Sequence, residues 1–216
     1  MDQIISWVLE HLNYWVVMLF MAIESSFIPF PSEVVVPPAA WLATVKDELN
    51  IVLVVIFATL GADIGALINY YLALWLGRPV VYRFANSRLG RICLIDEEKI
   101  KQAEAFFQKH GVISTLVGRL VPGVRQLISI PAGLSKMHVG KFLLYTTIGA
   151  GLWNIALALI GYFLAQVPGL NSVEAVVEKA TRYSHLLGYA LMAMALLLVA
   201  FFVYKATAAP KKSNKE

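Results

Sequence analysis

The sequence predicts an all-α polytopic membrane protein, and three observations support this fold class. Of the 216 residues, 59% are hydrophobic and 15% are charged, and the mean hydropathy is +0.69, which is more apolar than a soluble domain with one core. Residues 50–76 and 139–166 are uninterrupted apolar segments long enough to cross a bilayer as helices. Prolines and charged residues interrupt two further apolar stretches, residues 15–43 and 112–134. The function is therefore expected within the membrane.

Each interrupted stretch follows a segment with the period of an amphipathic helix, residues 2–13 and residues 96–110. Each half of an interrupted stretch has about 10 to 14 residues, whereas a spanning helix needs roughly 20. Two re-entrant helical hairpins are therefore predicted. Their breaks are expected at Pro29 and Pro31 in the first hairpin and at Pro122, Gly123 and Pro131 in the second.

The order of amphipathic helix, broken hairpin and full span occurs twice. This order predicts an inverted repeat, because paired broken segments in two halves of a chain are typical of transporters. A final apolar segment then predicts one more transmembrane helix. We expect one membrane domain, residues 1–205, made of repeat one (about 1–76), repeat two (about 96–166) and the final helix (about 184–205), followed by a tail at 206–216.

Basic residues indicate the orientation of the chain. The formal net charge is +4, and the basic residues lie beside apolar spans, in the central loop and after the last span, so nucleic-acid binding is not expected. Loops rich in Lys and Arg remain in the cytoplasm. The central loop and the C-terminus are therefore expected on the cytoplasmic side of the plasma membrane. The hairpin tips then approach each other from opposite sides. The side of the N-terminus stays open, since residues 4–23 could lie on the surface or span.

Four charged residues flank the predicted breaks: Glu24 and Glu33 in the first hairpin, Arg119 and Arg125 in the second. A charge at mid-membrane costs roughly 2.5–3.5 kcal/mol, so these side chains are expected to pair or to face a polar cavity. They predict either a substrate and proton pathway or ion pairs that only fix the hairpins. Asp63, in the first full span, is a third candidate proton site or a packing residue. Trp153 and Asn154 are interpreted as packing residues.

The chemistry of these groups points to a phosphate-bearing lipid and to protons. Arginine presents a planar set of donors suited to phosphate, so Arg119 and Arg125 are the candidate phosphate ligands. Glu24, Glu33 and Asp63 are the candidate proton-coupling groups, since proton co-movement offsets the electrical cost of carrying an anion inward. No catalytic motif and no metal-ligand spacing is present in the sequence, so we expect neither an enzyme, nor a metal site, nor a cofactor.

Several of these motifs, in combination, resemble the DedA family of bacterial inner-membrane proteins, also called SNARE-associated or VTT-domain proteins. The resemblance covers roughly residues 15–166 and rests on "ESSFIPFPSE", "GALINYYLALWLGRP", "GRLVPGVR", the following "PAG" and a GxxxWN pattern.

The resemblance implies two opposed re-entrant hairpins, with acids in the first and paired arginines in the second. It also implies lipid translocation, with undecaprenyl phosphate as the first candidate substrate. The alternatives are a phosphatidylethanolamine flippase or scramblase and a non-transporting membrane-homeostasis or assembly factor. Many members have a PGD-like acidic motif where this chain has PSE, so Glu33 replaces an aspartate. The substrate preference of this chain therefore stays open. Small residues in 146–151 fit either packing within the chain or a homodimer.

Overall fold

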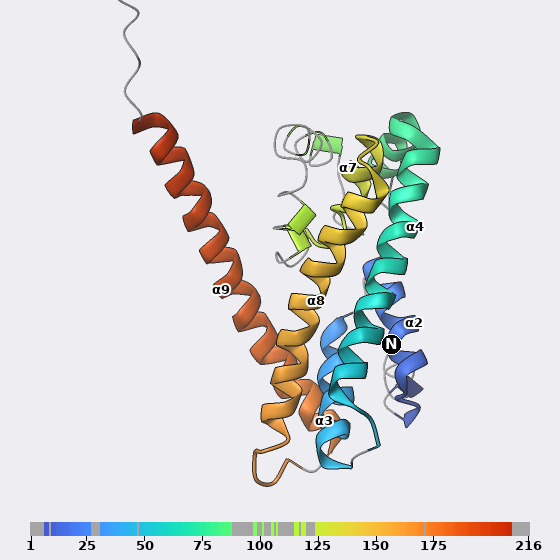
Figure 1. Cartoon of the computed structure of the whole chain (residues 1–216), viewed down its shortest axis with the longest axis vertical. Coiled ribbons are helices and arrows are strands. Elements are labelled where there is room, and N and C mark those ends of the chain that lie inside the picture. Colours follow the sequence, from blue (N-terminus) through green and yellow to red (C-terminus); the bar gives the residue numbers. More distant parts are fainter. Residues whose placement is uncertain are drawn as a thin grey trace, which may run out of the picture.

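The described residues of the chain form helices that pack side by side (Figure 1). The computed structural model describes residues 7–8, 10–26, 31–46, 48–87, 97–98, 101, 105, 107, 115–116, 118–119, 124–170 and 172–208, the last part mostly as backbone beyond residue 190. Every regular element within these ranges is helical and none is a strand. The predicted all-α class is confirmed for this part of the chain.

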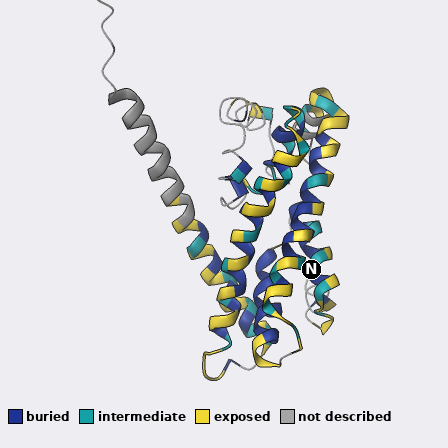
Figure 2. Cartoon of the chain, viewed as in Figure 1, coloured by how far each residue is buried: buried dark blue, intermediate teal, exposed yellow. Residues whose placement is uncertain are grey.

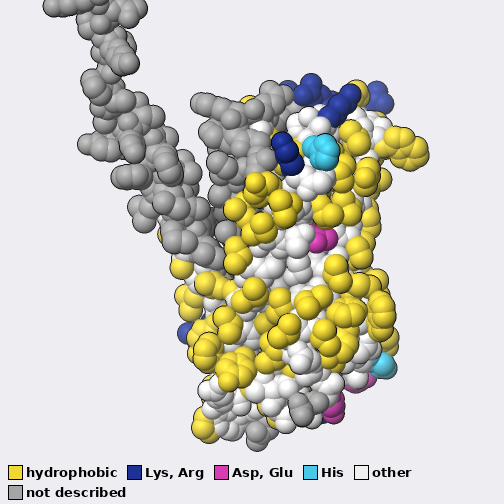
Figure 3. Space-filling model, in the orientation of Figure 1, with side chains coloured by type: hydrophobic (Ala, Val, Ile, Leu, Met, Phe, Trp, Pro, Cys, Tyr) yellow, Lys and Arg dark blue, Asp and Glu magenta, His cyan; other side chains and the backbone are white. Residues whose placement is uncertain are grey.

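Two long helices, α4 (Ile51–Ala85) and α8 (Val139–Leu164), run antiparallel through the whole height of the molecule (Figure 1). Residues Ile51–Val80 of α4 and the whole of α8 are long and apolar enough to cross a membrane. Hydrophobic side chains cover most of the face seen in Figure 3, and basic side chains gather at its upper end. This distribution is what a bilayer requires, because apolar groups face lipid while charged groups stay at the interface.

The first broken stretch forms two short helices and a 3₁₀ turn beside the lower half of α4 and α8 (Figure 1). Helix α2 (Tyr14–Ser25) starts after Asn13, whose side chain accepts hydrogen bonds from the next helical amides. A 3₁₀ turn, η1 (Ser32–Val34), follows Pro31 and leads into α3 (Val36–Val45). The 12 residues of α2 and the 10 residues of α3 are each too few to cross a bilayer.

The second broken stretch is described from residue 124 onward. Hydrogen-bonded turns over residues 124–128 lead into α7 (Ser129–Leu134), which lies beside the upper end of α4. Helix α7 has six residues, so it is shorter than the sequence pattern predicted. Pro131, predicted from the sequence to lie at a break, lies instead inside the first turn of α7, where the missing N–H of proline leaves no hydrogen bond unmade.

Two helices extend beyond their predicted limits. In α4, Gly77 has φ 68° and ψ 175°, and the helix resumes after this kink as far as Ala85. Glycine suits this point because a positive φ is costly for residues with a Cβ atom. Helix α9 (Val173–Ala208) starts 11 residues before the predicted 184. Ser172 accepts a hydrogen bond from the amide of Ala175 near the start of α9, which supplies the acceptor a helix N-terminus needs.

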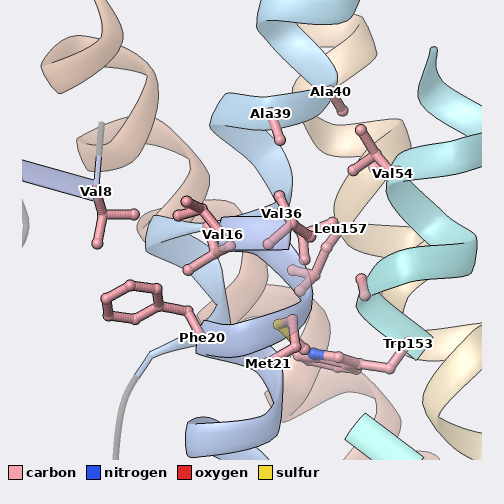
Figure 4. Packing of buried hydrophobic residues seen from close by; sticks show 14 residues of the cluster. Val8, Val16, Phe20, Met21, Val36, Ala39, Ala40, Val54, Trp153 and Leu157 are labelled. Atoms are coloured by element: carbon pink, nitrogen blue, oxygen red, sulfur yellow. The ribbon is translucent and has the colours of Figure 1, made fainter. Parts of the chain in front are cut away.

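The buried side chains lie where these helices face one another (Figure 2). The largest cluster joins α2, α3, α4 and α8; Figure 4 shows Trp153 of α8 reaching toward Met21 of α2 within it.

Glycines bring α2 and α4 into close contact in this core. A Cβ atom on Gly61 would collide with the carbonyl of Met18, and one on Gly65 would collide with that of Ala22. These glycines are four residues apart on α4, which is the spacing of a GxxxG packing face. The backbone of α2 therefore rests directly on α4, and this contact sets the position of the side chains at the end of α2.

Candidate functional site

The centre of the candidate site is a buried ion pair between the two broken stretches. Nη2 of Arg125 lies 2.8 Å from Oε1 of Glu24, and the two side chains are 13% and 4% exposed. Glu24 is near the C-terminal end of α2, and Arg125 is in the turns before α7. The second carboxylate oxygen, Oε2, accepts a hydrogen bond from the hydroxyl of Ser25 at 3.0 Å. One acid and one arginine that are distant in sequence are thus brought together.

Two further groups contact the Arg125 guanidinium. Nη2 donates a hydrogen bond of 2.9 Å to Oγ of Ser32 in η1. On another side, Cζ lies 4.8 Å from the centre of the Trp153 ring, which is the geometry of a cation–π contact. The indole Nε1 of Trp153 donates to the same Ser32 oxygen at 3.5 Å. Arg125 is therefore held by residues of α2, η1 and α8.

Asn69 of α4 links the same two stretches through the backbone. Its Nδ2 donates to the carbonyl of Ser25 at 3.2 Å and to that of Gln126 at 3.5 Å. Asn69 is 4% exposed, so these bonds are formed away from solvent and are costly to lose. The end of α2 and the turn that carries Arg125 are therefore fixed to the same point on α4.

Arg119 is buried near this pair and has different partners. It is 3% exposed, and its Nη2 donates a hydrogen bond of 3.0 Å to Ser129 of α7. Its Nε has no hydrogen-bond partner among the described residues. Glu24 and Asp63 both act electrostatically on the Arg119 guanidinium, and no described carboxylate forms a direct ion pair with it.

Space for the Arg119 side chain depends on Gly149 of α8. A Cβ atom at Gly149 would lie 2.6 Å from Cβ of Arg119, closer than real side chains approach. The glycine therefore allows the segment that carries Arg119 to rest on α8. Arg119 is placed in the same buried region as Arg125 by this contact and by Ser129.

Asp63 lies between α4 and α8. Its Oδ2 accepts a hydrogen bond of 2.7 Å from Thr147, and its Oδ1 is buried with no hydrogen-bond partner in the described part of the chain. One turn earlier on α4, Thr59 accepts a hydrogen bond of 3.2 Å from the amide of Asn154. The interface between the two long helices thus contains polar contacts at Thr59 and at Asp63, and Oδ1 of Asp63 has no partner among the described residues.

The structure places the remaining predicted residues as follows. Glu33 is 9% exposed in η1 and has no hydrogen bond or ion pair with the residues that the structure describes. Pro31 directly precedes η1. The predicted breaks at Pro29, Pro122 and Gly123 lie outside the described residues.

Sequence reasoning did not assign a role in the site to Ser32, Asn69 or Trp153. Trp153 and Asn154 were interpreted as packing residues, and the contact between Trp153 and the Arg125 guanidinium shows that Trp153 also touches a charged group. The "WN" dipeptide within a glycine-rich part of the span was the available signal. A tryptophan in an apolar segment is usually a packing or interface residue, so the pattern alone could not separate the two roles.

Residues that could hold a metal ion are not clustered in the described ranges, where no group of three or more His, Cys, Asp or Glu side chains is suitably placed. The chemistry available at the centre of the site is instead that of guanidinium, carboxylate, hydroxyl and indole groups. Guanidinium groups bind phosphate and carboxylate, and a carboxylate can exchange a cationic partner for a proton.

Comparisons with known proteins agree with this membrane architecture. Residues 28–163 match the model of the VTT domain. The chain is 34% identical over 205 residues to a Lactococcus lactis protein named alkaline phosphatase-like protein, covering 95% of this chain and 93% of that protein. It is 33% identical over 170 residues to undecaprenyl phosphate transporter A of Staphylococcus aureus, covering 79% and 83%.

A third relative is protein DedA of Escherichia coli, which is 28% identical over 159 residues, covering 72% of this chain and 70% of that protein. No solved structure is significantly similar to this chain. The VTT-domain match spans more than half of the sequence, and the first two relatives exceed 30% identity over most of it. The chain therefore belongs to the VTT-domain, or DedA, family of membrane proteins.

Proposed function

We propose that this chain is a membrane transporter that moves an anionic, phosphate-bearing lipid across the bacterial inner membrane, with undecaprenyl phosphate as the first candidate substrate. The observation that carries the proposal is the buried Glu24–Arg125 pair between two broken apolar stretches. Buried charges at membrane depth are costly and tend to mark pathways. The name of the Staphylococcus aureus relative supports the choice of lipid.

The proposed architecture is an inverted repeat of two opposed re-entrant hairpins, and the packing contacts support it. Each broken stretch rests on the long helix of its own half: α2 on α4 through Gly61 and Gly65, and the Arg119 segment on α8 through Gly149. Each also contacts the long helix of the other half: α3 meets α8 at Gly161, and α7 meets α4 at Gly133. This exchange of contacts is what a two-fold relation between repeats produces.

The proposed orientation places the upper end of Figure 3, where basic side chains gather, in the cytoplasm. In this orientation the first hairpin enters from the outside, the second enters from the cytoplasm, and the tail at 206–216 is cytoplasmic. The final helix, about 184–205, is proposed to span the membrane within the single domain of residues 1–205.

In the proposed mechanism, the lipid phosphate replaces Glu24 at the Arg125 guanidinium, while the apolar tail stays in the bilayer. Arg119 supplies a second cation, since its Nε has no partner among the described groups. The released carboxylate then binds a proton, which avoids leaving an unpaired negative charge in a dry site. Co-movement of that proton offsets about 2.3 kcal/mol per 100 mV for each negative charge carried inward.

Binding of undecaprenyl phosphate to the purified protein tests the lipid assignment. Wild type should bind it in preference to undecaprenyl diphosphate and phosphatidylethanolamine, and Arg119→Ala and Arg125→Ala should each bind at least tenfold more weakly, since a charge-assisted hydrogen bond contributes roughly 1.5–3 kcal/mol. Equal affinities in all three proteins would remove the arginines from headgroup recognition. Equally strong competition by phosphatidylethanolamine would favour a less selective phospholipid flippase or scramblase.

Proton coupling has its own test, in liposomes with an imposed pH difference. Inward transport by wild type should rise when the outside is made acidic, because the proton then moves down its gradient with the lipid. Glu24→Gln should lose this pH dependence, and Glu33→Gln and Asp63→Asn show whether the other two carboxylates share the role. Full transport with unchanged pH dependence in all three variants would exclude the coupling role.

A further inference from the structure

Among the described residues, the Arg125 guanidinium has one charged partner, Glu24, and two neutral partners, Ser32 and Trp153. Glu24 contributes a carboxylate at 2.8 Å. Trp153 contributes the face of its indole at 4.8 Å, and Ser32 contributes a hydroxyl oxygen at 2.9 Å. An incoming phosphate competes with the carboxylate, because two anions beside one guanidinium repel each other, but it has no such conflict with an aromatic face or a hydroxyl.

The neutral partners are also held more firmly than a surface group would be. Trp153 is 4% exposed and belongs to the largest buried cluster, in which its side chain lies beside Met21 of α2 (Figure 4). Ser32 is 0% exposed and accepts hydrogen bonds from both Arg125 and Trp153. A hydroxyl oxygen has two lone pairs, so one Ser32 can serve both donors at once.

The carboxylate contact is different in geometry. Oε1 of Glu24 lies at ion-pair distance from Nη2 but accepts no hydrogen bond from the described residues, and Oε2 is occupied by Ser25. A phosphate oxygen could take the place of Oε1 beside the same guanidinium nitrogen, so exchange of Glu24 for another anion would leave Arg125 with a charge-assisted contact of the same kind.

We propose that Trp153 and Ser32 form a permanent seat for the Arg125 guanidinium, and that the lipid phosphate exchanges only with Glu24. Trp153 is then a positioning residue: it does not touch the lipid, and it keeps the planar guanidinium in place while the anion beside it changes. This inference rests on the proposed function, since it assumes that Arg125 receives the phosphate. In this proposal, the anionic headgroup is recognised by the Arg125 guanidinium, and Trp153 of α8 fixes the orientation of that guanidinium.

The test compares two equally buried tryptophans. Trp153→Leu should weaken binding of undecaprenyl phosphate roughly tenfold, which corresponds to loss of a desolvated cation–π contact. Trp153→Phe keeps an aromatic face and should recover most of the affinity. Trp41→Leu is the matched control, because Trp41 is also 4% exposed but packs in a different buried cluster from Trp153, and it should bind like wild type.

A substitution at Ser32 tests the same proposal with less risk of unfolding the protein than a change at Trp153. Ser32→Ala removes the shared acceptor with little change in volume and should weaken binding about threefold to tenfold. In an Arg125→Ala background, Trp153→Leu should have little further effect, because no cation remains beside the indole face. A purely structural role for Trp153 would give the same loss in both backgrounds.

The outcomes separate this inference from the proposed function. Unchanged binding by Arg125→Ala would overturn the proposed function itself. Lost binding by Arg125→Ala, together with equal effects of Trp153→Leu and Trp41→Leu or no recovery by Trp153→Phe, would overturn only the seat. Wild-type binding by Ser32→Ala would remove Ser32 from it.

Discussion

Methionine in place of Arg125 is expected to destabilise the protein by about 3–5 kcal/mol and to abolish lipid transport. The cost arises because the substitution leaves the Glu24 carboxylate, which is 4% exposed, buried without its cation. Transport is lost because the group proposed to receive the phosphate is gone. Thermal unfolding in detergent and transport in liposomes measure the two effects separately.

The double variant Glu24→Gln with Arg125→Met should recover most of this stability and none of the transport. Removing both charges removes the penalty for an unpaired ion, since neutral replacements of a buried pair are often tolerated. Lys101→Met is the control: its ion pair with Glu97 is short, at 2.6 Å, but exposed, so its loss should change stability little. A double variant that is stable and restores cellular function would favour a non-transporting assembly factor.

The main helices could be predicted from the sequence because their signal is strong and local. Residues 50–76 and 139–166 are apolar for longer than a bilayer is thick, and they correspond to α4 and α8. Their ends were less well predicted. The predicted limit at residue 76 lies directly before the non-helical Gly77, and the chain is helical again after this kink as far as Ala85; composition does not reveal that second helical part.

Part of the site follows from the cost of charge in a membrane. That cost predicted that acids of the first broken stretch would meet arginines of the second, and Glu24 and Arg125 do lie together. It could not predict which members would pair. Arg119 contacts Ser129, and Glu33 has no polar contact with the described residues. Which side chains meet depends on how helices from distant parts of the chain align when they pack, and the sequence pattern does not show that alignment.

The contribution of Trp153 could not be predicted for a related reason. Its approach to Arg125 depends on the height at which α8 passes the first broken stretch, and that height is set by glycine contacts such as Gly161 against Pro37. Small residues in a span indicate close packing but do not name the surface they pack against. Ser32 and Asn69 were missed because a single hydroxyl or amide in an apolar segment has many candidate partners.

Alanine in place of Gly65 is expected to destabilise the protein by about 1–3 kcal/mol and to reduce lipid transport strongly. The new Cβ atom would collide with the carbonyl of Ala22 and would lie 2.9 Å from Cβ of Ser25. Backbone atoms cannot rotate away, so α2 must move off α4. Because Glu24 precedes Ser25, the same movement displaces its carboxylate from Arg125. Thermal unfolding and the liposome assay report the packing effect and the site effect.

Gly151→Ala is the matched control for this prediction, since Gly151 is also a glycine within a long spanning helix. A Cβ atom there would meet only Thr59, at 3.8 Å or more, which is ordinary contact. Alanine is favoured over glycine inside a helix by up to about 1 kcal/mol, so this variant should be as stable as wild type or slightly more stable. If Gly65→Ala behaved in the same way, the α2–α4 contact could not be what positions Glu24. The ion pair would then have to be held by Asn69 and the turn around Arg125, and α2 would follow the pair instead of placing it.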